Sequence, residues 1–139
     1  MWRDRSVMVV EDDDAVRAVL AQALGTELGA YTVVAPDGAE AVRWAQRLLP
    51  SVVILDLMLP SLDGFEVARR LRADPATNQT RIIAISALTP VSKVREQALD
   101  AGCDAFIAKP FRIDELLDLV HGYLRESDAE READRRGEA

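Results

Sequence analysis

The chain has 139 residues, of which 49% are hydrophobic and 29% are charged, and its formal net charge is −7. This length and composition fit one soluble globular domain that is large enough to bury a core. Binding to nucleic acid needs a basic face, so the acidic balance predicts that this chain does not itself contact DNA or RNA. Its one cysteine, Cys103, cannot form an internal disulfide, and no apolar stretch approaches the ~20 residues that span a bilayer. We therefore expect a cytoplasmic protein without a membrane segment.

Short apolar runs alternate along the chain with longer segments of helical periodicity. The apolar runs are rich in Val and Ile, and they predict strands over residues 6–10, 31–35, 51–55, 81–85 and 104–107. Runs that are almost wholly apolar are typical of parallel strands covered on both faces of a sheet. After each strand, apolar residues at helical spacing predict one helix, which gives five strand–helix units.

Helix boundaries are marked by capping and breaking residues. Residues 12–14 are candidate caps of the first helix, and Pro50 is expected to end the second. The third helix is entered through Asp63-Gly64, the fourth ends at Gly102, and the fifth begins just after Pro110. Right-handed crossovers between such units predict an open parallel sheet with helices on both faces.

The apolar periodicity stops at Glu126. The last 14 residues hold six acidic residues and three arginines, with only small apolar side chains between them. Such a segment cannot bury a face, so it is either a helical extension of the fifth helix or a charged tail. We therefore divide the chain into a folded domain over residues 1–125 and this segment over residues 126–139.

Polar residues interrupt the pattern where the predicted strands end. Acidic residues 11–14 follow the first strand, Asp56 follows the third, Ser86 the fourth and Lys109 the fifth. In open parallel sheets the binding site lies beyond the carboxyl ends of the strands, so these side chains should meet at one edge. Acidic residues after a strand are often only helix caps, the reading we prefer for Asp13 and Asp14, but an acid ending an apolar strand needs another reason.

The residue types at this edge suit phosphoryl transfer. Carboxylates from two strands can hold a hard divalent cation such as Mg²⁺. A carboxylate beside that cation can act as a nucleophile toward phosphorus. A hydroxyl and an ammonium group opposite it can stabilise the charged phosphoryl oxygens. The sequence therefore predicts a phosphoryl-accepting site centred on Asp56.

These motifs carry a family likeness. The segments VMVVEDD, VVILDLMLPSLDGFE, IIAISA and AGCDAFIAKPF occur in this order, and over roughly residues 5–125 the chain resembles the receiver domain of bacterial two-component response regulators, in its single-domain form. The resemblance implies a flavodoxin-like fold, an α/β fold whose five-stranded parallel sheet has the order 2-1-3-4-5. It also implies a signalling switch that is not an enzyme, although it assists its own phosphorylation and dephosphorylation.

The resemblance also assigns roles to individual residues. Asp56 is similar to the phosphoacceptor, and Glu11 and Asp12 to the acidic pair that holds Mg²⁺ together with Asp56 and the backbone carbonyl of Met58. Ser86 resembles the switch hydroxyl that moves to the phosphoryl group, and Lys109 the lysine that pairs with it. Two further expectations follow, namely that Phe106 occupies the aromatic switch position and that the Lys109–Pro110 peptide bond is cis.

The implied partners follow from the same likeness. The phosphoryl donor would be a phosphohistidine on a sensor histidine kinase or a histidine phosphotransfer protein. The phosphorylated form would contact a downstream protein, or a second copy of itself, through the fourth helix, fifth strand and fifth helix. A stand-alone receiver could also serve as a phosphate shuttle.

Some positions depart from the family pattern. Glu11 stands where Asp is more common, and Phe106 lacks the hydroxyl of the Tyr often found at its position. Met58 and Leu88 lie where side chains flank the water that hydrolyses the acyl phosphate. Neither side chain can orient water by hydrogen bonds, which predicts slow self-dephosphorylation.

Two other functions are weighed against this one. A phosphohydrolase of the haloacid dehalogenase family, with an aspartate nucleophile, would carry a second Asp where this chain has Met58. A flavin carrier would need a hydroxyl- and glycine-rich loop after the first strand, where this chain has EDDDAV. We expect His121 to lie on the surface and Cys103 to be a packed thiol without a redox role. Trp44 falls beside the apolar face of the second helix, and we expect it to be a packing residue.

Overall fold

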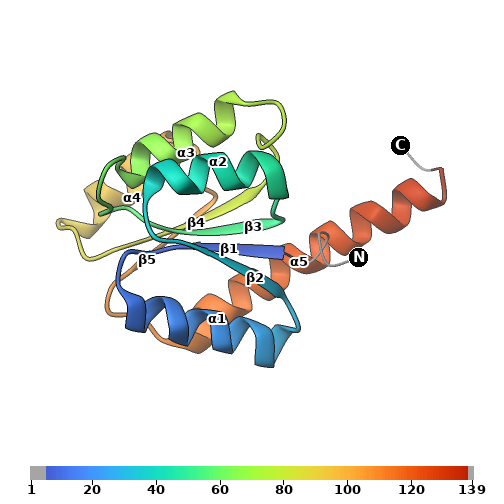
Figure 1. Ribbon diagram of the computed structural model, residues 1–139, viewed down its shortest axis with the longest axis horizontal. Helices are drawn as coiled ribbons and strands as arrows, with labels where there is room; N and C mark the ends of the chain where they lie inside the picture. The colour runs from blue at the N-terminus through green and yellow to red at the C-terminus, as the bar shows by residue number, and fades with distance from the viewer. Residues whose placement is uncertain (1–5, 138–139) are drawn as a thin grey trace.

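A computed structural model describes residues 6–137 as a five-stranded parallel sheet with helices on both faces (Figure 1). The strands are β1 (Ser6–Val10), β2 (Tyr31–Ala35), β3 (Val52–Asp56), β4 (Arg81–Ser86) and β5 (Ala105–Ala108). Their order in the sheet is β2-β1-β3-β4-β5, and every neighbouring pair is parallel. The predicted flavodoxin-like topology is therefore confirmed.

The helices form two layers. Helices α1 (Asp14–Leu28) and α5 (Ile113–Arg135) cover one face, and α2 (Gly38–Leu48), α3 (Gly64–Ala73) and α4 (Val91–Asp100) cover the other (Figure 1). Alternate side chains of the central strands feed these two layers. Met8 and Leu55 pack on the side of α2, α3 and α4, whereas Val9 and Ile54 pack on the side of α1 and α5. All four are fully buried, as the apolar runs predicted.

Three helices begin at an aspartate whose carboxylate closes the first turn. Asp13, Asp37 and Asp63 accept the N–H of the residue three positions later, at 3.0, 2.9 and 3.0 Å. Asp13 is thus the cap of α1, whereas Asp14 is the first residue of that helix. These caps fix the loops that lead from β1, β2 and β3 into their helices.

Two strands begin and end one residue later than predicted. Asp56 is the last residue of β3, where it lies opposite Ile85 of β4. Asp104 precedes β5, and its Oδ2 accepts the N–H of Ile82 at 2.8 Å, so its side chain replaces a ladder bond at the start of that strand. Asp56 therefore belongs to the sheet, which fixes its backbone more firmly than a loop would.

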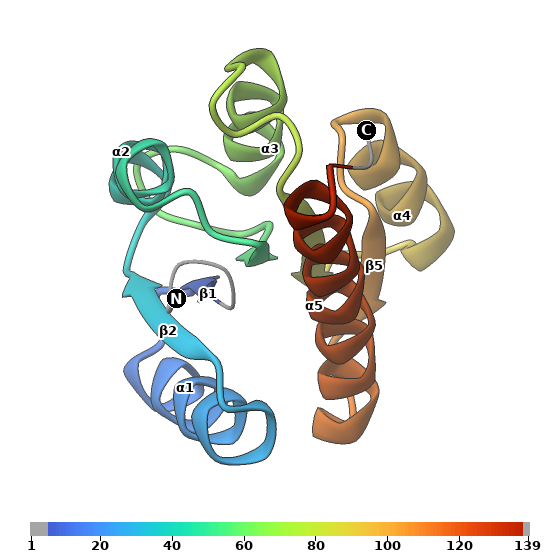
Figure 2. The ribbon, with the colours of Figure 1, turned by 90° about the vertical axis from the view of Figure 1, so that its right-hand side faces the viewer.

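Helix α5 continues past the sheet to Arg135 (Figure 1), and in Figure 2 this extension points toward the viewer. Among the side chains of α5 that the structure describes, the last buried one is Leu124, and Glu126 forms an ion pair with Arg81 at 3.2 Å. Residues 126–137 thus continue the fifth helix and then end in a turn, whereas residues 138–139 of this segment lie outside the described residues. Within residues 6–137, no helix has the length and apolarity that a membrane span requires.

Candidate functional site

The carboxyl ends of four strands bring the predicted polar residues together. Glu11 directly follows β1, Asp56 ends β3, Ser86 ends β4 and Lys109 directly follows β5. Ser86 lies opposite Ala108 in the register of β4 and β5, so Lys109 emerges one residue beyond it. The parallel arrangement therefore gathers at one edge residues that are far apart in the sequence.

Lys109 joins two buried carboxylates at this edge. Its Nζ lies 2.8 Å from Oδ2 of Asp56 and 3.1 Å from Oε1 of Glu11. Glu11 is 1% exposed and Asp56 is 4% exposed. Because two carboxylates this buried repel each other, the ammonium group between them offsets a cost that would otherwise open the site.

The ionisation of the group follows from this arrangement. Burial raises the pKa of Glu11, and the charge of Asp56 adds to that rise, whereas the Asp13 N–H and Lys109 act in the opposite direction. For Lys109, burial works against the charged form, but hydrogen bonds and charges from Asp56 and Glu11 outweigh it and raise the pKa of the ammonium group. Lys109 therefore stays positively charged at neutral pH.

The remaining carboxylate oxygens are held by the main chain. Oδ1 of Asp56 accepts the N–H of Met58 at 2.9 Å, and Oε2 of Glu11 accepts the N–H of Asp13 at 3.2 Å. Asp12 differs from both, because it is exposed and its side chain has no hydrogen-bond partner within residues 6–137. Its carboxylate is thus free to bind a ligand from solvent.

The three carboxylates fit a hard divalent cation. Glu11, Asp12 and Asp56 each offer an oxygen, and these oxygens lie within 4.8 Å of one another. Carboxylate oxygens are what Mg²⁺ prefers, and one exposed ligand leaves room for the water molecules that Mg²⁺ keeps. The residues present are therefore suited to Mg²⁺.

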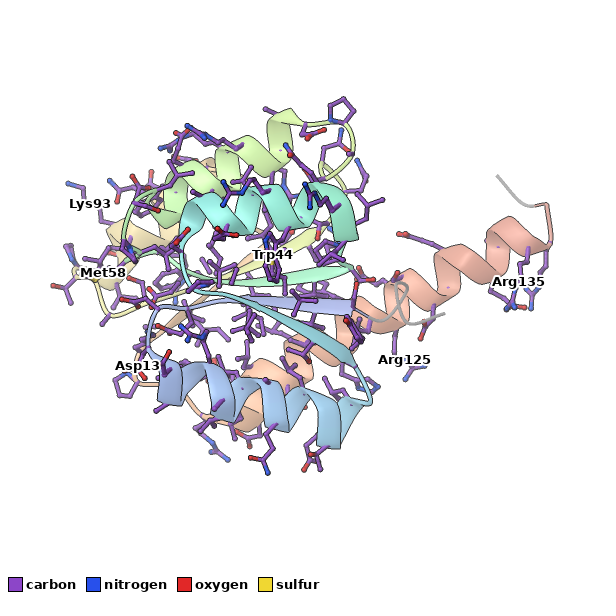
Figure 3. The ribbon with its side chains drawn as sticks, viewed as in Figure 1. Asp13, Trp44, Met58, Lys93, Arg125 and Arg135 are labelled. Atoms are coloured by element: carbon purple, nitrogen blue, oxygen red, sulfur yellow. The ribbon has the colours of Figure 1, made fainter. Side chains whose placement is uncertain are left out.

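The other residues predicted to take part in the site differ in how far they are buried. Ser86 is fully buried, and its hydroxyl accepts the N–H of Leu88 at 3.0 Å. Leu88 is half-buried, whereas Met58 is 56% exposed and projects from the same end of the molecule as Asp13 (Figure 3). Within the described residues, the side chains of Ser86 and Phe106 form no hydrogen bond or ion pair with the carboxylates.

Sequence reasoning missed two arginines that contact this region. Arg17 of α1 donates from Nη1 to the backbone carbonyl of Glu11 at 2.9 Å. The guanidinium of Arg95 of α4 lies 5.5 Å from the ring centroid of Phe106, a cation–π distance. Neither arginine belongs to a motif at a strand end, so their contacts become apparent only once the helices are packed on the sheet.

The Lys109–Pro110 peptide bond is cis, as expected, and the Thr89–Pro90 peptide bond is cis as well.

Three residues set aside in the sequence lie away from the carboxylates. His121 is exposed on α5. Cys103 is buried, and burial raises the pKa of its thiol to about 12, so the reactive thiolate is scarce at neutral pH. Trp44 is 39% exposed and lies on α2, away from the end of the molecule that carries Asp13 and Met58 (Figure 3).

Comparison with known proteins identifies the family. Residues 7–121 match the family model described as the response regulator receiver domain. The chain belongs to this family. The receiver domain therefore takes part in phosphorylation-based two-component signalling, which confirms the resemblance found in the sequence.

Two curated relatives show the extent of the likeness. The receiver domain is 34% identical over 123 residues to the DNA-binding dual master transcriptional regulator RpaA of Synechocystis sp. (strain ATCC 27184 / PCC 6803 / Kazusa), covering 88% of this chain and 50% of RpaA. It is 40% identical over 120 residues to response regulator MprA of Mycobacterium sp. (strain KMS), covering 86% of this chain and 50% of MprA. The chain thus spans about half the length of these relatives.

One solved structure has the same fold as this chain over most of the length of both proteins. It is the receiver domain of sensor histidine kinase PA1611 from Pseudomonas aeruginosa PAO1, with a magnesium ion coordinated in its active site cleft. It shares 32% sequence identity with a TM-score of 0.75, and the match covers 86% of this chain and 97% of that one.

Proposed function

We propose that this receiver domain accepts a phosphoryl group on Asp56 from a phosphohistidine of a sensor histidine kinase or histidine phosphotransfer protein. The observation that carries the proposal is the contact of Lys109 Nζ with both Asp56 and Glu11, since a positive charge lies there beside the buried carboxylate that would act as the nucleophile. Glu11, Asp12, Asp56 and the backbone carbonyl of Met58 would hold Mg²⁺. The magnesium-containing cleft of the PA1611 receiver domain supports this assignment.

The chemistry needs one new bond and one broken bond. A carboxylate oxygen of Asp56 attacks phosphorus, the new O–P bond forms, and the P–N bond to the histidine breaks. Bound Mg²⁺ supplies positive charge that stabilises the phosphoryl oxygens. Lys109 contributes the second positive charge, and the Met58 N–H keeps the carboxylate oriented.

The conformational change caused by phosphorylation would extend from Ser86 to the surface formed by α4, β5 and α5. The buried Ser86 hydroxyl would turn from the Leu88 N–H toward the phosphoryl oxygens, drawing the β4–α4 loop with it. Phe106 would pack inward behind it, and Arg95 would carry the change to α4 because its guanidinium lies over the Phe106 ring. A downstream protein or a second copy of the chain would recognise the altered surface.

Location and nucleic-acid contact stay predictions from the sequence. A histidine kinase donor would place the receiver domain in the cytoplasm. RpaA is described as DNA-binding, but this chain covers half of that protein and carries a net charge of −7. We therefore propose that the receiver domain does not contact DNA directly.

Replacing Asp56 with asparagine tests the proposal. Incubation with Mg²⁺ and acetyl phosphate should add the mass of one phosphoryl group to the wild type, whereas Asp56→Asn should show no addition. Asp118→Asn, which changes an exposed carboxylate on α5, should be phosphorylated as the wild type is. Intact-mass spectrometry with and without Mg²⁺ measures this. Modification that survives in Asp56→Asn would contradict the proposal, and repeated turnover on a small phosphoester would favour a phosphohydrolase.

The acyl phosphate on Asp56 is expected to decay slowly. Because Met58 and Leu88 cannot hydrogen-bond an attacking water, the double variant Met58→Asn with Leu88→Glu should lose the phosphoryl group about tenfold faster. Decay after removal of the phosphoryl donor, followed by intact mass, measures the rate. The matched control, Leu49→Asn with Leu99→Glu, changes two exposed leucines elsewhere and should decay as the wild type does. Equal rates in the two double variants would refute the role of Met58 and Leu88.

A further inference from the structure

The main chain on both sides of Asp12 is held by side chains. The carbonyl of Glu11, which precedes Asp12, accepts a hydrogen bond from Arg17 Nη1 at 2.9 Å. The N–H of Asp13, which follows Asp12, donates to Oε2 of Glu11 at 3.2 Å. Both peptide groups of Asp12 are therefore fixed, although its own carboxylate is exposed and unpartnered within residues 6–137.

Arg17 can hold this loop because it is itself anchored in a helix. It lies in the first part of α1, whose start is fixed by the Asp13 cap, and its backbone N–H donates to the Asp13 carbonyl at 3.0 Å. Its side chain is 19% exposed and also forms an ion pair with Asp14. A rigid helix thus presents a donor to the loop that carries the exposed carboxylate.

The loop needs such a restraint, because residues 11–14 are four acidic residues in a row. Like charges at this spacing repel one another and favour an open loop. Lys109 offsets the repulsion at Glu11 from the side of β5, where its ammonium group contacts the Glu11 carboxylate. Arg17 is the side chain that fixes this peptide.

We propose that Arg17 is a positioning residue of the divalent-cation site, which holds the Glu11–Asp12 peptide so that the Asp12 carboxylate points toward Glu11 and Asp56. This inference rests on the proposed function. Arg17 would touch neither the phosphoryl group nor the cation. Without its Nη1 donor, the peptide could rotate, and the three carboxylate oxygens would converge less often.

The charge of Arg17 would have the opposite effect on cation binding. A guanidinium near the site repels Mg²⁺, so a role in charge balance alone predicts tighter binding when Arg17 is removed. The positioning role predicts weaker binding. A variant that removes the donor without changing the net charge separates the two effects, and the ion pair of Arg17 with Asp14 provides one.

The decisive variant is Asp14→Asn with Arg17→Met, which removes one charge of each sign. We expect its dissociation constant for Mg²⁺, measured by isothermal titration calorimetry without any phosphoryl donor, to rise about tenfold. The matched control is Glu40→Gln with Arg43→Met, because Arg43 of α2 forms the same type of ion pair with Glu40. This control should bind Mg²⁺ as the wild type does, and circular dichroism should show native helix content in both variants.

Two further measurements distinguish positioning from a general loss of structure. The Mg²⁺ concentration that gives half-maximal phosphorylation by acetyl phosphate should rise by the same factor, whereas the rate at saturating Mg²⁺ should stay unchanged. Arg17→Lys, which keeps the charge and one donor, should recover part of the affinity. If the charge-neutral variant binds Mg²⁺ as tightly as the wild type, Arg17 does not position Asp12. If the wild type itself does not bind Mg²⁺, the magnesium site of the proposed function is overturned together with this inference.

Discussion

Replacing Gly64 with alanine should lower the free energy of unfolding by about 3 kcal/mol, because the new methyl group has no room. A Cβ on Gly64 would lie 2.5 Å from the Cα of Leu57 and 2.6 Å from the backbone carbonyl oxygen of Asp56. Both neighbours are backbone atoms, and the peptide between them also donates its N–H to Ile85 in β4 at 3.0 Å. The chain directly after Asp56, the proposed phosphoacceptor, would have to move.

The displacement should also affect phosphorylation. The Leu57 carbonyl accepts the N–H of Gly64 at 3.1 Å, so the start of α3 and the end of β3 shift together. Because the Met58 N–H fixes one oxygen of Asp56 at 2.9 Å, a shift of this segment reorients the carboxylate. We expect slower phosphorylation of Gly64→Ala by acetyl phosphate, measured at a temperature where circular dichroism shows it folded.

Gly25→Ala is the matched control for Gly64→Ala. Gly25 lies inside α1, and apart from its chain neighbours and the backbone of that helix, a Cβ there would meet no atom within 4 Å. Alanine should stabilise the helix by about 0.5–1 kcal/mol through its higher helix propensity. Urea unfolding of both variants measures the contrast. Equal stability of Gly64→Ala and the wild type would show that the Asp56–Leu57 peptide moves without cost.

Replacing Lys109 with methionine should lower the free energy of unfolding at pH 7 by about 2 kcal/mol. The variant leaves the carboxylates of Glu11 and Asp56 buried and without their shared cation. Removing one partner of a buried ion pair costs about 3–5 kcal/mol, and the 27% exposure of the Lys109 side chain reduces this penalty. Lys93→Met, which removes an exposed lysine of α4 (Figure 3), should leave stability unchanged.

The stability lost in Lys109→Met should depend on pH. Burial already raises the pKa of Glu11 above its ordinary value, and Lys109 opposes that rise. Without Lys109 the folded-state pKa rises further, so folding favours the protonated acid. The destabilisation relative to the wild type should therefore be small at low pH, where Glu11 is protonated in both the folded and the unfolded state. It should grow as the pH rises from the folded-state pKa of Glu11 in the wild type to the higher folded-state pKa in the variant.

Urea unfolding of Lys109→Met at pH 5 and pH 7 measures this dependence. We expect a smaller difference from the wild type at pH 5 than at pH 7. A difference that is the same at both values would show that the loss comes from packing of the lysine stem, since that contribution does not titrate. Added Mg²⁺ should restore stability at pH 7, because a cation that binds only the folded state stabilises it.

The sequence alone was enough to predict the strand positions to within one residue, their order through the family likeness, and the edge at which Glu11, Asp56, Ser86 and Lys109 meet. Such prediction works because the responsible signals are local. Apolar runs mark strands buried on both faces, capping aspartates mark helix starts, and parallel strands place all their carboxyl ends at the same edge. Residues separated by whole helices could therefore be assigned to one site.

The tertiary structure decided which side chains join elements that are far apart in the sequence. Asp104 illustrates this, because its place before β5 results from hydrogen bonds to Ile82, Arg72 and Arg81, which belong to β4 and α3. No pattern near residue 104 marks such contacts, since long arginine side chains join elements without leaving any periodicity. Trp44 is a second case, because the helical pattern assigned it to packing, whereas the residue is 39% exposed.

For the candidate site, the sequence predicted which groups would carry the chemistry, and the structure shows which contacts hold them. Acid, hydroxyl and ammonium types at strand ends identify the site, because the reaction requires them. Two features appear only when the helices are packed on the sheet. They are the hydrogen bond from Arg17 to the Glu11 carbonyl and the close approach of Gly64 to Asp56. Both depend on distances between elements, which the order of residues along the chain does not specify.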